Sequence, residues 1–272
     1  RHEATQRRVV VEQNLAPDFC RFVEREEASE LAGWPVAMGG WWFAGGGWIN
    51  PPSLCSANLA GLDVRYNVCI ERIEAAGSGW RLLDAAGATL GKAEHVVLAN
   101  ANDARRLATE LPLRVGRGQV SHLPAAATPA LKIVVTRLGY VMPAVDGIRC
   151  AGATLSPDDG DAELRLADHV ENLVRLDMTL PGFGQGLDAA QLDGRVGFRP
   201  MSPDRLPIVG PLATPGWWTL NGFGARGLVW AALCAEVLAA QIAGQAPPLE
   251  AELLAALHPA RFFERARRRG KV

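Results

Sequence analysis

Two arginines stand where a protein could hold a carboxylate. Arg199 ends a predicted strand just before a turn rich in proline and serine, and Arg226 lies at the predicted start of a helix. A helix dipole disfavours a cation at that end by up to about 1 kcal/mol, so a nearby anion would offset the cost. Two converging arginines would form a bidentate clamp for a carboxylate. Each arginine also has a structural interpretation that the residues alone allow equally well. Arg226 could be an ordinary exposed arginine, and Arg199 could form an ion pair with Asp204 or another neighbour.

A glycine-rich turn precedes the same helix. Gly222, Gly224 and Gly227 follow a predicted strand at 217–220 and have the spacing of a dinucleotide-binding loop. A βαβ unit needs a second parallel strand after the helix, whereas this chain continues with two prolines and another helical stretch. We therefore expect the helix amino terminus to face a group that gains negative charge, such as the ring of a flavin on reduction.

An aromatic, glycine-rich run occupies residues 39–52. Its three consecutive glycines, Gly45 to Gly47, allow a tight turn or close contact with a flat ligand. Asn50 is expected to cap a helix over 53–60. The tryptophans at 41, 42 and 48 could line a substrate entrance, and packing between domains is an equally good interpretation.

Composition limits the classes of protein. The chain has 272 residues, 49% of them apolar, with 28 basic and 29 acidic side chains, so we expect a globular protein without an overall field for nucleic acid. The five cysteines show no metal-binding spacing and predict reduced thiols in a cytoplasmic protein. The five histidines do not cluster, so no metal site is expected. No stretch approaches a membrane span, and the start at Arg1 looks like the middle of a domain.

The pattern of elements predicts an α/β protein with two interleaved domains. Buried-strand patterns occur at 94–99 and 217–220, and a long helix is expected from residue 228 to about 244. A second, sheet-based domain is predicted from strand patterns at 113–123, 132–135, 140–142 and 148–154. Two other strands are predicted at 64–73 and 80–83, and two other helical segments at 16–33 and 161–176.

Several segments together resemble one family. GFRPMSPDRLPIVG (197–210) and GFGARGLVWAALCAEVLAAQI (222–242) are similar to the closing segments of the D-amino acid oxidase and glycine oxidase family of flavoproteins. FAGGGWINPPSLC, HVVLAN, RGQVSHLP, GYVMPAVDG and LAALHPARFFERARRRGK extend the likeness over nearly the whole chain. Within the family, the likeness is strongest to oxidoreductase domains that modify tRNA.

The resemblance implies a fold, a cofactor and a reaction. It implies an incomplete FAD-binding, Rossmann-like domain with an interleaved, mainly antiparallel substrate domain. Such a domain oxidises the carboxymethylaminomethyl group of the tRNA wobble uridine, leaving aminomethyluridine and glyoxylate, and works with a fused or partner methyltransferase that uses S-adenosylmethionine. Arg199 and Arg226 fall at the family's substrate and flavin arginines. The implied cofactor-binding residues are Gly45, Gly46, Gly47, Ala99, Asn100, Gly222, Phe223, Gly224, Ala225, Arg226, Gly227 and Leu228.

The resemblance also implies a domain organisation. Residues 1–50 are expected to connect to the substrate domain, 51–112 to belong to the FAD-binding domain, 113–198 to the substrate domain and 199–272 to the FAD-binding domain with a basic tail. That tail, with Arg261, Arg265, Arg267, Arg268, Arg269 and Lys271, is either a solvated end or a contact with the tRNA backbone.

The sequence departs from the family at two places. The opening GxGxxG loop is absent from the sequence, and Ala101 stands where a glycine is usual. A small-molecule glycine or D-amino acid oxidase and a truncated, non-catalytic fragment therefore remain alternatives.

Overall fold

The computed structural model describes residues 2–268 and divides into two compact units. Unit 1 contains residues 1–62, 118–155 and 161–197, and unit 2 contains residues 63–117, 156–160 and 198–272. The chain therefore passes between the units several times, as the alternation of sequence patterns predicts. Each unit is described by itself below.

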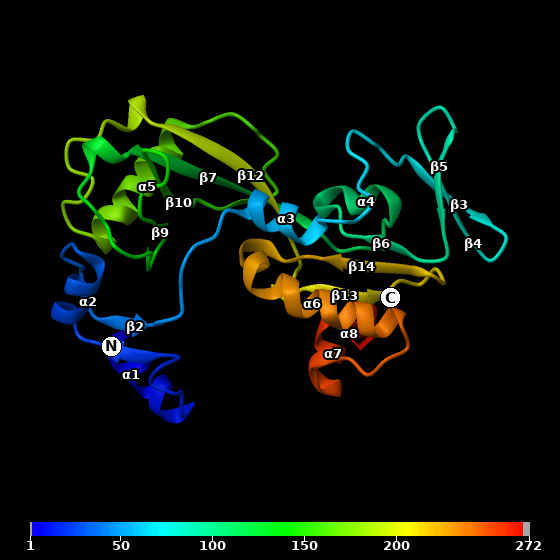
Figure 1. The fold of residues 1–272 in the computed structure, drawn as a ribbon, viewed down its shortest axis with the longest axis horizontal. Helices are drawn as coiled ribbons and strands as arrows, with labels where there is room; N and C mark the ends of the chain where they lie inside the picture. Colours follow the sequence, from blue (N-terminus) through cyan, green and yellow to red (C-terminus); the bar gives the residue numbers. More distant parts are fainter. Residues whose placement is uncertain (1, 269–272) are drawn as a thin grey trace. The chain divides into compact units, whose positions relative to one another are not determined.

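Unit 1 is built on an antiparallel sheet (Figure 1). In this sheet β7 pairs with β10, β10 with β9 and β9 with β8, and β12 also pairs with β7. A separate two-stranded antiparallel sheet pairs β1 with β2. The elements are α1 (His2–Glu12), β1 (Arg21–Val23), α2 (Arg25–Ala32), β2 (Gly40–Trp42), α3 (Pro51–Leu59), β7 (Arg114–Pro124), β8 (Val135–Thr136), β9 (Tyr140–Val141), β10 (Ile148–Gly152), α5 (Leu166–Thr179) and β12 (Asp193–Met201). The first residues of β7 and the last of β12 belong to unit 2.

Helix α5 covers the sheet of unit 1 and closes its main core. Leu176 and Leu180 pack with Leu123, Val141 and Phe183 in a fully buried cluster. Burial of such side chains contributes about 1.5–3 kcal/mol each. This core holds the sheet and the helix together.

Polar side chains also fasten α5 to β7. The buried Ser121 hydroxyl lies 2.8 Å from Nδ1 of His169, and Nδ2 of Asn172 donates to the Gln119 carbonyl at 3.0 Å. Burial lowers the pKa of His169, since desolvation disfavours the imidazolium. These side chains are buried and bonded to one another inside the unit, although Oδ1 of Asn172 has no hydrogen-bond partner, so a structural role for them is the simplest interpretation.

Unit 2 contains two small sheets. β3, β4 and β5 form an antiparallel meander, while β13, β14 and β6 form a mixed sheet in which β14 and β6 are parallel. The elements are β3 (Arg72–Ala76), β4 (Gly79–Leu83), β5 (Thr89–Ala93), β6 (Val96–Leu98), α4 (Ala104–Leu107), β11 (Ser156–Pro157), β13 (Ile208–Pro211), β14 (Trp217–Asn221), α6 (Gly227–Ile242), α7 (Ala251–Leu257) and α8 (Arg261–Arg268). The strands predicted at 94–99 and 217–220 are present as β6 and β14, and they pair in one sheet.

Helix α6 lies along β13 and β14 (Figure 1). Cys234, Val237 and Leu238 form its buried face, with Val209 of β13 and Leu257 of α7. Burial raises the pKa of the Cys234 thiol to about 11, so this thiol stays protonated and packs as an apolar group. All five cysteines are free thiols.

Four sequence-based predictions of elements are wrong at their edges. Of the strand expected at 132–135, only Val135 lies in a strand, β8. The segment 16–33 contains strand β1 before helix α2, because residues 21–23 pair with β2. The expected strand at 64–73 begins only at Arg72, where pairing with β4 starts. Helix α5 begins at Leu166 rather than at 161, because the side-chain amide of Gln119 bonds both backbone groups of Arg165 and holds that residue extended.

The expectation that no stretch approaches a membrane span also needs correction. Among the described residues, the helix over 224–242 is long and apolar enough by composition to cross a membrane. One such helix is weak support for a membrane protein, and one face of this helix packs against its own sheet.

Candidate functional site

The carboxyl ends of β6 and β14 lie side by side in unit 2. The Thr219 hydroxyl donates to the Leu98 carbonyl at 3.2 Å, and Nδ2 of Asn221 donates to the Ala101 carbonyl at 2.9 Å. Ala99 and Asn100 are thereby placed beside the turn that follows β14. In open α/β sheets this edge, outside the carboxyl ends of parallel strands, is where ligands bind.

The glycines of the turn after β14 have different roles. Gly222 has a φ of 73°, and a Cβ on it would lie 2.9 Å from Cγ1 of Ile208, so glycine is required there for the fold. Gly224 has a φ of 56°, but a Cβ on it would meet nothing closer than Cγ of Met201 at 3.9 Å. The backbone at Gly224 is therefore open to a close neighbour, whereas the backbone at Gly222 is already packed.

The start of α6 has no capping side chain. Its N-cap residue is Arg226, and no side chain accepts a hydrogen bond from the first-turn N–H groups. Uncapped N–H groups and the positive end of the dipole favour an anion or a polar acceptor. Ala225, Arg226 and Leu228 are exposed, and Gly227 is half-buried. This donor set fits the electron-accepting edge of a flavin, which becomes negative on reduction.

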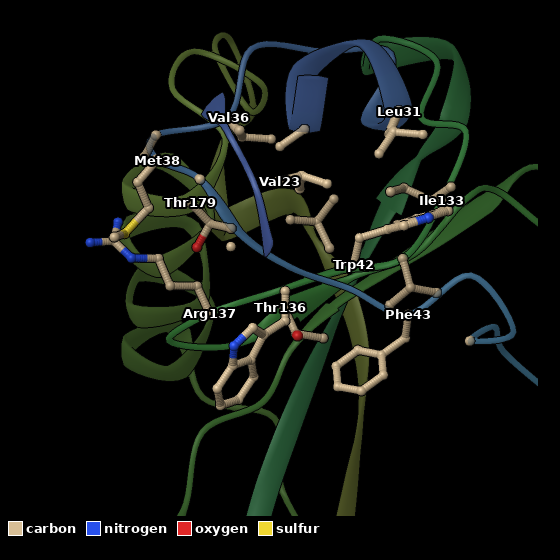
Figure 2. Close-up of a pocket in the computed structure, with 18 of the residues that line it drawn as sticks. Val23, Leu31, Val36, Met38, Trp42, Phe43, Ile133, Thr136, Arg137 and Thr179 are labelled. Carbon is tan, nitrogen blue, oxygen red and sulfur yellow. The ribbon is translucent and has the colours of Figure 1, made fainter. Parts of the chain in front are cut away.

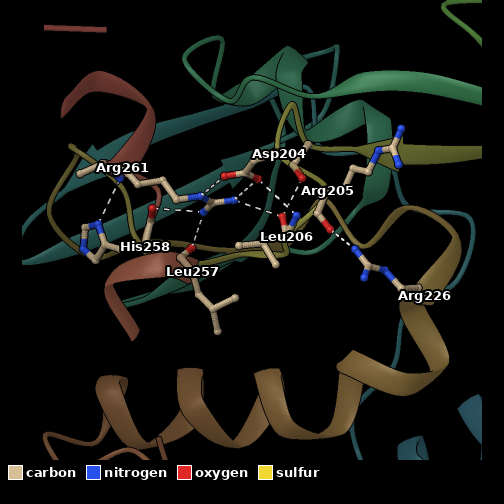
Figure 3. A network of polar contacts seen from close by, with 9 residues as sticks. Asp204, Arg205, Leu206, Arg226, Leu257, His258 and Arg261 are labelled. Atoms are coloured by element: carbon tan, nitrogen blue, oxygen red, sulfur yellow. Dashed lines mark hydrogen bonds and ion pairs between the residues drawn. The ribbon is translucent and has the colours of Figure 1, made fainter. Parts of the chain in front are cut away.

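Arg226 is held by backbone rather than by a carboxylate. Its guanidinium donates to the carbonyl of Arg205, in the turn between β12 and β13 (Figure 3). Phe223 and Met201 form an isolated β-bridge across the same turn. The start of α6 is thus tied to the strand end that follows Arg199.

Arg199 lies half-buried on β12 in unit 2. The preceding carbonyl, that of Phe198, accepts from Nδ2 of Asn102 at 3.4 Å. Oδ1 of Asn102 is buried without a hydrogen-bond partner. The segment after β6 therefore contacts the strand that carries Arg199, and an unsatisfied polar atom lies at this contact.

The turn at 202–207, which contacts Arg226 through the Arg205 carbonyl, is also bound by Arg261 (Figure 3). Its Nε and Nη2 bind the two carboxylate oxygens of Asp204 at 2.9 and 3.0 Å, and Nη2 also donates to the Leu206 carbonyl at 3.1 Å. Nη1 donates to the carbonyls of Leu257 and His258. Arg261 is only 4% exposed, so this fork–fork pair is a buried anchor.

The position of Arg261 corrects the prediction of a basic tail beginning at that residue. Arg261 is a packed part of unit 2, although the sequence groups it with the arginines that follow. Arg267 is exposed on α8. Arg269 and Lys271, and the side chains of Arg265 and Arg268, lie outside the described part of the chain.

The structure brings together most, but not all, of the residues singled out from the sequence. Unit 2 contains Ala99, Asn100, Arg199 and the whole segment from Gly222 to Leu228. Gly45, Gly46 and Gly47 belong instead to unit 1, where they follow β2 on the exposed surface.

Sequence reasoning missed three residues of this region. Asn221, Asn102 and Arg261 connect segments about 55 to 120 residues apart through side-chain bonds. For Asn221, the only local signal was its position directly before the glycine turn. The other two depend on long-range pairing that a single sequence does not display.

Comparison with known proteins agrees with this geometry. Residues 2–241 match the family model described as FAD dependent oxidoreductase. The chain is 51% identical to the tRNA 5-methylaminomethyl-2-thiouridine biosynthesis bifunctional protein MnmC of Aromatoleum aromaticum and 48% identical to the protein of that name from an Azoarcus species. Each match covers 98% of this chain and 45% of the relative, so the chain spans less than half the length of these relatives.

The fold has solved counterparts as well. The crystal structure of glycine oxidase from Bacillus cereus superposes with a TM-score of 0.73 at 17% identity, covering 92% of this chain and 72% of that one. The likeness supports an α/β fold of the glycine oxidase type, with its antiparallel sheet and its mixed sheet. With the family model matching most of its length, the chain belongs to the family of FAD-dependent oxidoreductases.

Proposed function

We propose that this chain is the carboxy-terminal part of an FAD-dependent amine oxidoreductase that acts on the carboxymethylaminomethyl group of the tRNA wobble uridine. The uncapped start of α6, with Arg226 beside it and Gly224 open to a neighbour, carries the proposal. The identity of about half the residues with tRNA-modifying bifunctional proteins supports this choice of substrate. It also supports a fused methyltransferase domain as partner and a cytoplasmic location, where tRNA is found.

The residues of unit 2 suit this chemistry. When bound, FAD supplies the acceptor for a hydride from the α-carbon of the amine. Arg199 would hold the carboxylate of the glycine-like arm, and the start of α6 would stabilise the charge on the cofactor edge. Ala99, Asn100 and the turn from Gly222 to Leu228 would contact the cofactor.

The reaction needs no side-chain base in this arrangement. The secondary amine loses a hydride from carbon, which gives an iminium between that carbon and nitrogen, and the nitrogen then releases its proton to water to leave the imine. Water then adds to the imine carbon, and the carbon–nitrogen bond breaks to release glyoxylate and the aminomethyl base. The tasks left to the protein are to orient the carbon and to exclude water until oxidation is complete.

The organisation into domains follows the units. We propose that unit 2 is part of the FAD-binding domain, and that unit 1 is the substrate domain with its connecting segments. Residues 1–50 and 113–198 would then belong mainly to the substrate domain, and residues 51–112 and 199–272 mainly to the FAD-binding domain.

Anaerobic stopped-flow spectroscopy of the full-length protein tests the function. Mixing with tRNA that carries the carboxymethylaminomethyl group should bleach the flavin absorbance and release glyoxylate in equal amount. Glycine and D-alanine serve as small-molecule comparisons. Rapid bleaching by these amino acids, without bleaching by the modified tRNA, would assign the protein to small-molecule oxidases instead.

A further inference from the structure

A cavity of about 510 Å³ lies in unit 1, and Gly46 and Gly47 belong to its lining. It is enclosed by β2 and the turn after it, by α2 and by the segment 133–137 around β8. Figure 2 shows Val23, Leu31, Val36 and Ile133 among its apolar lining. The volume lies within the range of roughly 300–1,000 Å³ typical of ligand sites.

Aromatic rings border this cavity and remain uncovered. Trp41, Phe43 and Trp48 all line it and are 42%, 42% and 50% exposed. Trp41 is held in place by its Nε1–H, which donates to the Gln6 carbonyl at 2.9 Å, and by an edge contact with Phe43. Trp41 and Phe43 are therefore positioned by the fold, while much of the surface of all three rings stays exposed. Exposed apolar surface gathered around a hollow is typical of a binding site.

The charge at the cavity favours an anion. Arg137 is the one charged residue of its lining, and no carboxylate lines it within the described chain. One nitrogen of this guanidinium donates to the Met178 carbonyl. A guanidinium has five N–H donors, so others can bind an anion. Planar aromatic surface and a cation in the lining of one mainly apolar hollow are complementary to a nucleotide, whose base stacks and whose phosphate is negative.

We propose that this cavity binds one nucleotide of the tRNA anticodon loop, with its base stacked on Trp48 and its phosphate bound by Arg137. The proposal rests on the proposed function and specifies how tRNA would be held by unit 1. A loop nucleotide fits because a base in a loop can leave its stack at low cost, whereas a paired base cannot. The contact would select tRNA over the free modified nucleoside.

The test measures binding of a fluorescent RNA hairpin with an anticodon stem-loop sequence to the full-length protein. Trp48→Ala should weaken binding at least about fivefold, since stacking of one base contributes ~1–3 kcal/mol. Trp48→Phe should keep most of the affinity because a ring remains. Tyr66→Ala is the matched control, because Tyr66 is 73% exposed in unit 2 and should leave affinity unchanged.

A second arm leaves the protein intact. Abasic sites are introduced one at a time into the hairpin loop, and one of them should weaken binding to the wild-type protein. That loss should disappear when the partner is Trp48→Ala, because the stacking partner has already been removed. Arg137→Gln should weaken binding and reduce its salt dependence by about one unit of slope.

The outcomes separate this proposal from the proposed function. No binding of the hairpin by the wild type, or equal affinity for every abasic hairpin, would overturn the nucleotide site even if modified tRNA bleaches the flavin. Tight, Trp48-dependent hairpin binding supports the site even if the flavin is not reduced. In an active enzyme, Trp48→Ala should raise KM for tRNA.

Discussion

Ala101 adopts a backbone conformation that alanine avoids. Its φ is 54°, in the left-handed region, and its carbonyl accepts the bond from Asn221 at the proposed cofactor edge. A Cβ in this region costs roughly 1–2 kcal/mol, partly offset by the greater entropy that a glycine loses on folding. Ala101→Gly is therefore expected to raise the free energy of unfolding by about 0.5–1 kcal/mol in urea titrations.

A second alanine provides the control for this substitution. Ala235 is exposed in the middle of α6, where the backbone is helical. Ala235→Gly should lower stability by about 1 kcal/mol, since glycine is a poor helix former. If both substitutions destabilise the protein equally, the backbone at Ala101 is not strained.

Arg199 is the residue on which the proposed substrate binding depends most. Truncation of a buried, charge-assisted pair costs about 2–5 kcal/mol, because the remaining charge is left without a partner. In the full-length protein, Arg199→Ala should slow flavin reduction at limiting tRNA by ~30-fold or more. Arg199→Lys should recover only part of the loss, since an ammonium cannot form the planar two-bond fork.

The flavin content serves as an internal control for this prediction. It should stay normal in both variants, and Arg72→Ala, an exposed arginine on β3 of unit 2, should behave as wild type. Unchanged rates in Arg199→Ala would mean that the carboxylate is held elsewhere and that Arg199 has a structural role.

At the scale of elements, the buried pair of Arg261 and Asp204 joins the α7–α8 junction to the turn before β13. That turn also supplies the carbonyl that holds Arg226. Removing one member of a buried pair leaves the other desolvated, at a cost of roughly 3–5 kcal/mol. Arg261→Ala is therefore expected to destabilise unit 2 by about that amount and to disturb the environment of the flavin in the full-length protein.

Arg267→Ala is the matched control on the same helix, because Arg267 is exposed. Thermal unfolding should show a clear loss of stability for Arg261→Ala and none for Arg267→Ala. Equal behaviour of the two variants would mean that Arg261 belongs to a solvated tail, as the sequence alone allowed.

Elements with a strong local pattern were predictable, and those decided by distant contacts were not. The strand at β6, the strand at β14 and helix α6 follow from continuous apolar runs, and glycines also bound the last two. The cap of α3 by Asn50, whose Oδ1 accepts from the Ser53 N–H at 2.9 Å, is equally local. The start of α5 depends instead on Gln119, 46 residues earlier, which no local pattern shows.

The same distinction applies to the candidate site. Arg199 and the glycine turn stand out by residue type and spacing, so the sequence was sufficient to select them. The burial of Arg261 was hidden, because five further basic residues follow it and suggest a solvated end. Only its pairing with Asp204, 57 residues away, shows that this arginine belongs to the fold.

At the scale of the whole molecule, the unpaired edge of β6 and the exposed face of α6 in unit 2 determine how tightly we expect FAD to bind. Among the described residues, β6 pairs with β14 on one side and has no partner on the other. Leu228 and Val229 on α6 are 58% and 80% exposed. After α6 the described chain continues into α7 and α8 rather than into a second parallel strand. A complete cradle for the pyrophosphate requires a strand–loop–helix unit with such a strand.

The 272-residue polypeptide alone is therefore expected to bind FAD weakly. The start of α6 can interact with one part of the cofactor, but a helix dipole contributes only about 0.3–1 kcal/mol at an exposed position, rising to ~2 in favourable geometry. When the polypeptide is mixed with excess FAD and passed through a gel-filtration column, the protein peak should lack the visible absorbance of flavin. A polypeptide extended to the length of the bifunctional relatives should keep it.

Substituting Gly224 by valine in the longer protein should then reduce flavin content, since a side chain would block the open backbone, while Phe263→Ala on the exposed face of α8 should not. A yellow cofactor that co-elutes with the 272-residue polypeptide would show that β6, β14 and α6 suffice to hold FAD.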